Sequence, residues 1–218
     1  MKKIFFVFLF LFLSDFSFAQ TSADSANDEG TGVLAFSAGE YYANFSKLNS
    51  QLKSWGAAKT FSAFNAVGIT GEGVVAIGLR GSFDGEFSLE WFLPQDISIK
   101  DSLKFRLHGW HLMTSLYGID LIHKKHVSLV AGPGVDWGAA KLIRTLNGSK
   151  GHYNNIFIAP FARVELKFTF PKIAFGVRAF YRVDFTLNDW VAEEDYLTAL
   201  PHTNLSGGGF QFFVGYRF

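Results

Sequence analysis

The segment NIFIAPFARVELKFTFPKIAFGVRAFYRVDF, residues 155–185, decides the fold because its side chains alternate between apolar and polar types. From Ala162 to Phe170, before the Pro171-Lys172 dipeptide, apolar residues occupy even positions, whereas Arg163, Glu165 and Lys167 occupy odd ones. After the dipeptide the apolar residues occupy odd positions. A period of two indicates β-strands with one oily and one charged face. The dipeptide between them predicts a hairpin with a two-residue turn.

A two-residue turn also fixes the register of this hairpin. Residue 170 then faces residue 173, which places Glu165 opposite Arg178 and Phe168 opposite Phe175. The first pair shares the charged face and the second pair shares the oily face. The expected register therefore satisfies both faces of the sheet.

Strand length separates a soluble sheet from a membrane-spanning one. Strands of soluble sheets usually run about 5–6 residues, whereas these two strands run about 15 residues each. A membrane strand needs about 9–11 residues, with aromatic residues near its ends. Phe168, Phe170, Phe175 and Tyr181 fit such an aromatic belt.

Extending the pattern along the chain predicts an all-β fold, an eight-stranded antiparallel transmembrane β-barrel. The expected strands lie near residues 32–41, 61–70, 74–90, 104–121, 127–141, 155–170, 173–187 and 208–218. Tight turns are expected at Gly71-Glu72, around Lys124-Lys125 and at Pro171-Lys172, and long loops at 42–60, 91–103, 142–154 and 188–207. Strict alternation of short and long connections is typical of outer-membrane barrels, with short periplasmic turns and long outer loops.

The first residues differ from the rest. Lys2 and Lys3 precede the apolar run Ile4–Leu13, and Ser17-Phe18-Ala19 supplies small residues for cleavage. This pattern predicts a cleavable signal peptide over 1–19. Residues 20–31 are small, polar and acidic, and we expect a flexible periplasmic lead-in there, before the barrel over 32–218.

Composition excludes several classes of function. The 218 residues contain no cysteine, which excludes disulfide frameworks and thiolate metal sites. The net charge of +1 gives no basic field to attract nucleic acid, so no nucleic-acid partner is expected.

The C-terminal strand carries a second signal. Its alternating apolar residues are Phe210, Phe212, Val214, Tyr216 and Phe218. In this the sequence resembles outer-membrane barrels of the OmpA/OmpX-type eight-stranded architecture, which the bacterial barrel assembly machinery recognises through a terminal aromatic strand. The resemblance implies outer-membrane lipid and that machinery as partners. Phe213 departs from the pattern, because many such signals carry glycine there.

A looser resemblance covers nearly the whole mature chain. Leu48–Leu52, Ala131–Gly134 and Gly207–Phe210 look like segments of small barrels of Bacteroidetes-type bacteria. That group has no agreed activity, so the resemblance implies no catalytic residue.

The inward positions of the predicted strands carry most of the charge. The expected interior residues are Arg80, Asp136, Arg163, Glu165, Lys167, Arg178, Arg182, Asp184 and Arg217. An eight-stranded barrel is just wide enough for side chains to fill it, and an unpaired buried charge is costly. We therefore expect a packed ionic network, with a narrow ion path as the alternative.

In the first long loop, Phe45, Leu48, Leu52 and Trp55 recur at spacings of three and four, which predicts a short amphipathic helix. This helix could cap the barrel mouth, lie on the membrane interface or dock a partner. In the fifth predicted strand, Pro133 cannot donate a ladder hydrogen bond and predicts a bulge.

Reactive groups are few. His126-Val127-Ser128 is the only close serine–histidine pair, without a supporting carboxylate, and we interpret it as a polar turn. His108 and His111 fall on opposite faces of a strand and cannot share a metal ion. The last long loop carries acidic residues that could hold divalent ions, although a solvated loop is favoured: Asp189, Glu193, Glu194 and Asp195.

No catalytic residue, cofactor or metal ligand is therefore predicted. The sequence favours a non-enzymatic outer-membrane barrel, exported to the bacterial outer membrane, that acts as an envelope scaffold or binds an envelope partner through its outer loops. Two alternatives stay open: a lipid-modifying enzyme and a narrow pore.

Overall fold

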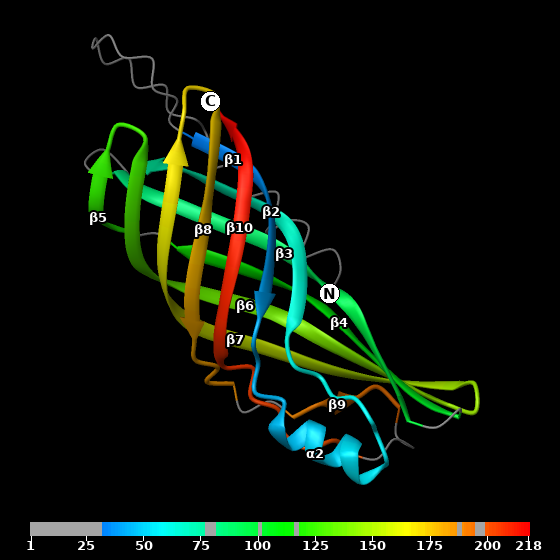
Figure 1. Cartoon of the computed structure of the whole chain (residues 1–218). Coiled ribbons are helices and arrows are strands. Elements are labelled where there is room, and N and C mark those ends of the chain that lie inside the picture. The colour runs from blue at the N-terminus through cyan, green and yellow to red at the C-terminus, as the bar shows by residue number, and fades with distance from the viewer. Residues whose placement is uncertain (1–31, 77–81, 100–101, 116–117, 187–188, 195–198) are drawn as a thin grey trace.

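The chain forms the expected eight-stranded antiparallel barrel (Figure 1). The computed structural model describes residues 32–218 except 77–81, 100–101, 116–117, 187–188 and 195–198. The elements are β1 (Gly32–Tyr41), α2 (Ser46–Ser54), β2 (Phe64–Ala76), β3 (Ser82–Ile99), β4 (Leu103–Ser115), β5 (Ile119–Lys124), β6 (Val127–Leu146), β7 (Ser149–Thr169), β8 (Ile173–Arg182), β9 (Val191–Ala192) and β10 (Gly207–Arg217). The predicted signal peptide and lead-in lie outside the described residues.

The barrel strands pair in chain order, with β4 joined to β6 and β8 joined to β10, and β1 pairs with β10 to close the barrel. β4 and β5 pair with successive parts of β6, so together they occupy one of the eight strand positions of the barrel. The first and last strands meet where the backbone N–H of Gly32 donates to the Phe218 carbonyl oxygen at 3.1 Å. The same end of the barrel carries the turn between β7 and β8 (Figure 1).

The predicted register of the β7–β8 hairpin is confirmed. Glu165 pairs with Arg178 and Phe168 pairs with Phe175. The Phe170 N–H donates to the Ile173 carbonyl oxygen at 2.8 Å across the Pro171-Lys172 turn. Alternation therefore located both the strands and the turn of this hairpin.

The turn expected at Gly71-Glu72 is wrong, because β2 continues through it to Ala76. Gly71 pairs with Phe87, and a Cβ at Gly71 would lie 2.6 Å from the Phe87 ring. The glycine therefore serves close packing between two strands, and glycine in a strand often marks such an approach. Arg80, expected inside the barrel, lies outside the described residues.

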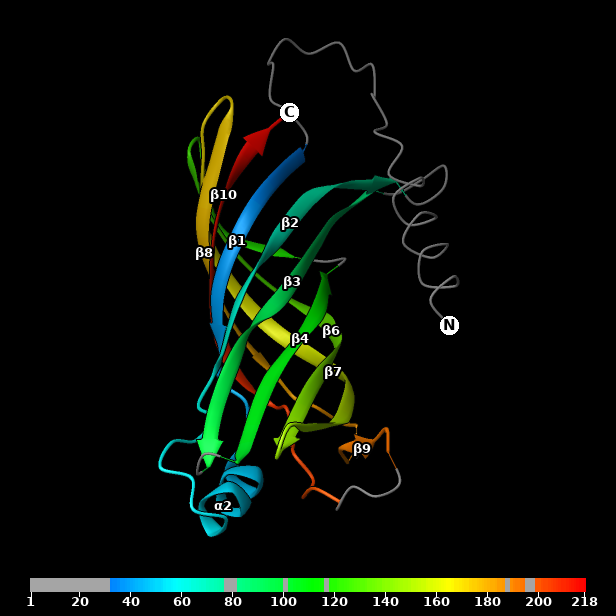
Figure 2. The same ribbon diagram turned by 90° about the vertical axis from the view of Figure 1, so that its right-hand side faces the viewer.

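The long loops expected at 91–103 and 142–154 are also wrong. β3 continues to Ile99, and β6 and β7 continue to a tight turn at Asn147-Gly148. These two turn residues have φ of 50° and 85°, as a two-residue hairpin turn with the twist of its strands requires. The strand ends extend past β2 and β8 as a ribbon, which we define as residues 93–99, 103–109, 141–146 and 149–155 (Figures 1 and 2).

The polarity of the two faces inverts where the barrel passes into the ribbon. In the barrel the outward side chains are apolar, and the charged side chains point inward among buried apolar ones. In the ribbon the inward side chains are apolar and buried: Ile97, Ile99, Phe105, Leu107, Leu142 and Tyr153. The outward ones include Asp96 and Arg106, whose bidentate pair has distances of 2.7 and 2.8 Å. The Arg106 guanidinium lowers the pKa of the Asp96 carboxyl. The ribbon is thus built like a water-facing sheet.

A row of tryptophans marks the inversion on the outer surface. Trp91 pairs with Trp110 across β3 and β4, and the Trp110 ring lies 5.8 Å from that of Trp137 on β6. Trp137 pairs with Ile158 on β7. The segment of β7 from Ile158 to Phe168 contains eleven residues. Phe168 stacks on Phe175 at 5.2 Å near the opposite end of the barrel. The apolar belt thus has aromatic residues at both rims.

The predicted helix in the first loop is confirmed as α2, and it packs against the ribbon end of the barrel (Figure 2). Leu48 and Leu52 are fully buried, and the Trp55 ring stacks on Phe105 at 5.7 Å. The helix ends before Gly56, whose φ of 97° is the left-handed conformation that glycine adopts after a helix. No helix in the described part of the chain has the length and apolar character to cross a membrane.

The distortion expected at Pro133 lies in the neighbouring strand instead. β6 keeps one register along β7 through Pro133 and Ala162. On its other side β4 ends at Ser115 and β5 begins at Ile119, and the Ser115 hydroxyl donates to the Pro133 carbonyl oxygen at 2.7 Å. Because proline has no N–H to donate, the ladder lacks a donor at this level.

Candidate functional site

The barrel interior near the turn end holds a compact ionic cluster. Arg178 lies 2.6 Å from Glu165, and Arg163 lies 3.3 Å from the same carboxylate. Glu86 on β3 forms ion pairs with both arginines. All four side chains are at most 8% exposed. β7 and β8 supply three of these residues because their register places Glu165 beside Arg178.

Between this cluster and the β7–β8 turn, a cavity of about 240 Å³ opens toward the turn end of the barrel. The Lys167 ammonium lies 2.6 Å from the Glu72 carboxylate on its wall. Arg217 also lines the cavity, as does Ser128. The lumen is therefore open and lined by polar side chains at this end, and filled by side chains nearer the ribbon.

A second buried cluster lies toward the ribbon end. The Asp136 carboxylate lies 2.5 Å from Arg182 and 2.9 Å from Nδ1 of His111. The His111 Nε2 lies 3.2 Å from Glu90, to which the Tyr41 hydroxyl also donates. Arg182 stacks its guanidinium over the Phe157 ring at 4.7 Å. All of these polar side chains are buried.

Gln211 on β10 joins the two clusters. Its Oε1 accepts a hydrogen bond from Arg178 at 2.5 Å, and its Nε2 donates to Ser88 and to Glu90 at 2.7 Å each. A continuous chain of polar contacts thus connects the cluster near the turn end with the cluster toward the ribbon end. Charged pairs with satisfied hydrogen bonds are the form in which a low-dielectric interior tolerates ions.

Asp184 does not join these ion pairs. Its carboxylate accepts hydrogen bonds from the Leu205 N–H at 3.0 Å and the Thr186 N–H at 2.9 Å, so it organises the segment after β8. The sequence reasoning missed Glu72, Glu86 and Glu90. Glu86 and Glu90 are four residues apart and therefore lie on the same face of a strand, and this spacing could have identified both as inward-facing.

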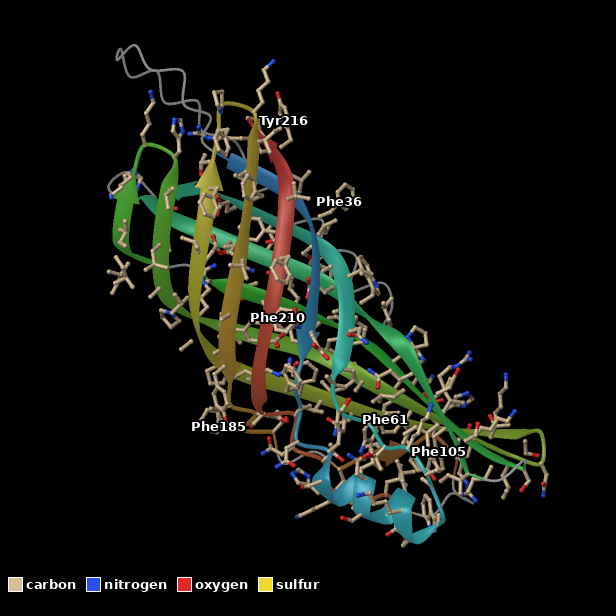
Figure 3. The ribbon with its side chains drawn as sticks, viewed as in Figure 1. Phe36, Phe61, Phe105, Phe185, Phe210 and Tyr216 are labelled. Carbon is tan, nitrogen blue, oxygen red and sulfur yellow. The ribbon has the colours of Figure 1, made fainter. Side chains whose placement is uncertain are left out.

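The ribbon end of the lumen is closed by apolar side chains. Phe64 stacks on Phe92 at 4.2 Å, and Phe45 of the first loop contacts Phe64 at 5.2 Å. Leu48 and Leu52 of α2 belong to the same buried cluster as Phe61 and Phe105, which Figure 3 labels at this end of the barrel. The predicted apolar face of the helix thus covers the barrel mouth. Of the three expected roles, capping the mouth, lying on the membrane interface and docking a partner, this is capping.

The candidate reactive groups are not brought together. His126 Nδ1 lies 3.0 Å from the Thr169 carbonyl oxygen, and its ring stacks on Phe170. The buried Ser128 hydroxyl has no hydrogen-bond partner in the described part of the chain. His111 lies inside the barrel, whereas His108 lies on the ribbon beside Lys141. The structure supports no nucleophile activated by His126.

The aromatic residues of the last strand lie on the outer surface. Phe212, Val214, Tyr216 and Phe218 are each 42–57% exposed, and Tyr216 projects outward like Phe36 of β1 (Figure 3). Phe213 points inward and is 5% exposed. A Cβ at Gly176 would lie 2.7 Å from its ring, so Phe213 fills the space that Gly176 leaves. Phe210 is half-buried at the other end of the strand.

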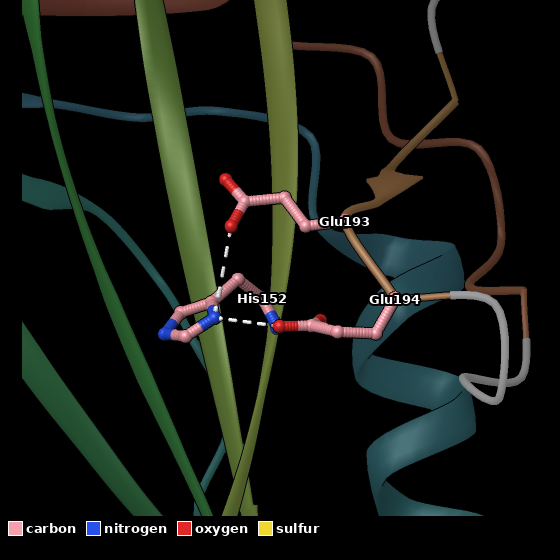
Figure 4. Close-up of side chains that lie close together, drawn as sticks. All are labelled: His152, Glu193 and Glu194. Atoms are coloured by element: carbon pink, nitrogen blue, oxygen red, sulfur yellow. Dashed lines mark hydrogen bonds and ion pairs between the residues drawn. The ribbon is translucent and has the colours of Figure 1, made fainter.

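Outside the barrel, His152 of the ribbon meets Glu193 and Glu194, which follow β9 (Figure 4). His152 Nδ1 lies 3.0 Å from Glu194 Oε1 and 3.7 Å from Glu193 Oε2. Hydrogen bonds from the His152 backbone lower the pKa of Glu194, and hydrogen bonds from Asn154 and Lys141 lower that of Glu193. The acidic residue Asp195 lies outside the described residues.

Solved structures share this fold. The crystal structure of Ail, the attachment invasion locus protein of Yersinia pestis, aligns with a TM-score of 0.46 at 13% identity, covering 87% of this chain and 99% of Ail. Ail in complex with the heparin analogue sucrose octasulfate aligns with a TM-score of 0.50 at 13% identity and the same coverage. Neisserial surface protein A aligns with a TM-score of 0.44 at 12% identity, covering 87% of this chain and 97% of that one.

No protein-family model matches the chain, and no curated protein matches it significantly. At 13% identity the likeness to Ail establishes the fold class, that of small outer-membrane eight-stranded barrels. Fold transfers no function by itself.

Proposed function

We propose that this chain is an integral outer-membrane barrel without enzymatic activity, which anchors a binding surface formed by the ribbon and the segments 42–63 and 183–206. The observation that supports it best is the inversion of polarity at the tryptophan row. An outward oily face is stable only against lipid, and an outward charged face only in water. The inversion therefore fits the border of a membrane.

The dimensions of the belt agree with this proposal. The eleven residues from Ile158 to Phe168 match the roughly 9–11 residues of a membrane strand. Tryptophan is enriched at membrane interfaces because its ring is apolar and its N–H is polar. Outer-membrane lipid is then the partner of the belt, and the last strand is the segment that the barrel assembly machinery would recognise.

The filled lumen favours an anchor over a pore. Glu165 and Arg178 are at most 3% exposed in the axis of the barrel, and Phe64 and α2 close the ribbon end. A narrow path would need water around these charges, and planar-bilayer current would reveal it. The enzyme alternative loses its only candidate because His126 hydrogen-bonds a backbone carbonyl. The ribbon and its two flanking segments then carry the contacts with an envelope partner.

The absence of cysteine makes the topology directly testable. Single cysteines at Lys47 on α2 and Lys172 in the β7–β8 turn lie at opposite ends of the barrel. On intact cells, a membrane-impermeant maleimide should label Lys47→Cys at once and Lys172→Cys only after the outer membrane is permeabilised.

The unsubstituted chain is the control, since it has no thiol to react. Labelling of both positions on intact cells would show that the barrel does not separate two compartments. Labelling of Lys172→Cys alone would place the ribbon in the periplasm and end the proposal of an outer binding surface.

A further inference from the structure

His152, Glu193 and Glu194 lie close together on the ribbon (Figure 4), and His152 is on the outward face because it alternates with the buried Tyr153. β9 pairs with the free edge of β7, with Tyr153 opposite Ala192. The Glu193 N–H donates to the His152 carbonyl oxygen at 2.9 Å. This short pairing sets the two glutamates beside one imidazole although 41 positions separate His152 from Glu193 in the sequence.

The three groups present their ligand atoms to one point. His152 Nδ1, one oxygen of Glu193 and one oxygen of Glu194 all lie within 4.8 Å of one another. A tetrahedral zinc ion with bonds of about 2.0–2.1 Å needs its ligand atoms about 3.3 Å apart. The two distances from Nδ1, 3.0 and 3.7 Å, lie on either side of that value.

The remaining oxygen of each carboxylate is already held. Glu194 Oε2 accepts the His152 N–H at 2.8 Å, and Glu193 Oε1 accepts Asn154 Nδ2 at 2.6 Å and Lys141 Nζ at 3.3 Å. Each glutamate therefore keeps one oxygen directed at the imidazole. Metal ligands in proteins are oriented by such outer hydrogen bonds.

We propose that His152, Glu193 and Glu194 bind one zinc ion on the outer face of the ribbon, with a fourth position open to water. An imidazole with two carboxylates suits zinc, whereas calcium takes six to eight oxygen ligands. The side chains are 26–42% exposed, so an ion can enter from solution. The ion would hold the segment after β9 against β7. The zinc site goes beyond the proposed function, because it does not depend on which end of the barrel faces outward.

The test is calorimetric titration of Zn²⁺ into the full mature chain, refolded in detergent, purified without a polyhistidine tag and stripped with a chelator. The expected result is one Zn²⁺ per chain. His152→Ala should weaken binding by more than about 100-fold, and Asn154→Ala by about 10- to 100-fold, the usual effect of removing an outer-shell partner.

His202→Ala is the matched control. His202 lies in the same segment and also pairs with one carboxylate, that of Asp189 at 3.3 Å, but it is not part of the three-residue cluster. This variant should bind Zn²⁺ as the parent does. If His152→Ala fails to fold, as judged by heat-modifiable migration on gels, the Glu193→Gln/Glu194→Gln double variant takes its place. Absence of binding to the parent chain, or equal binding by the parent and the folded variant, would overturn the proposal.

Discussion

At the scale of single residues, the two buried ionic clusters of the barrel keep their charges in pairs with little exposure to solvent. Asp136 is fully buried and lies 2.5 Å from Arg182. Removal of one partner from a buried pair costs about 3–5 kcal/mol, because the other charge stays buried without compensation. Asp136→Asn should therefore lower the free energy of unfolding by about that amount. Urea titration in lipid vesicles, followed by tryptophan fluorescence, measures it.

The control is the same change in an exposed pair. Asp96 and Arg106 are 57% and 55% exposed, and such pairs contribute at most about 1 kcal/mol. Asp96→Asn should thus change the free energy of unfolding by less than about 1 kcal/mol. Equal effects of the two substitutions would mean that the interior pair is hydrated.

Individual residues also show how far the sequence could be interpreted. Alternation and one turn dipeptide placed Glu165 opposite Arg178, because register follows from local pattern alone. Glu90 and His111 are likewise opposite one another on β3 and β4, but the loop wrongly predicted at 91–103 and the register shift after Phe92 hid this pair from the sequence. His152 and Glu194 depend on the path of a whole segment back to β7, so spacing in the sequence could not join them.

At the scale of elements, α2 is a cap whose stability comes from its buried face. Leu52 is fully buried, whereas Lys53 beside it is exposed. Truncation of a buried leucine costs about 2–5 kcal/mol, so Leu52→Ala should destabilise the folded chain by that order. Lys53→Ala should change stability by less than about 0.5 kcal/mol. Faster protease cleavage in 42–63 of Leu52→Ala, with Lys53→Ala unchanged, would show local release of the cap.

The strands of the ribbon show why the sequence predicted loops where strands exist. The prediction assigned oily residues to the outer face throughout, which holds for residues near Val164 but not for Phe105 or Leu107. Beyond the tryptophan row the solvent changes from lipid to water in our proposal, so the same period of two carries the opposite polarity. Pro94 and the register shift after Phe92 further interrupt the pattern.

At the scale of the whole molecule, an added charge should destabilise the belt much more than the ribbon. Val164 lies outward near the middle of the belt and is 46% exposed, and Leu146 at the tip of the ribbon is 38% exposed. Arginine on the lipid face costs about 2–4 kcal/mol at the bilayer midplane and about 0–1 kcal/mol near the interface. Val164→Arg should therefore lower the free energy of unfolding in vesicles by about 2–4 kcal/mol, and Leu146→Arg by less than about 1 kcal/mol.

Reversible urea unfolding in vesicles measures both variants against the parent chain. Both sites are apolar and similarly exposed, so the difference between the two costs reports mainly the medium around each side chain. A difference of about 2 kcal/mol or more requires lipid around Val164 and water around Leu146. Equal and small costs would mean that both faces are in water, and the polarity inversion would then no longer support a membrane border.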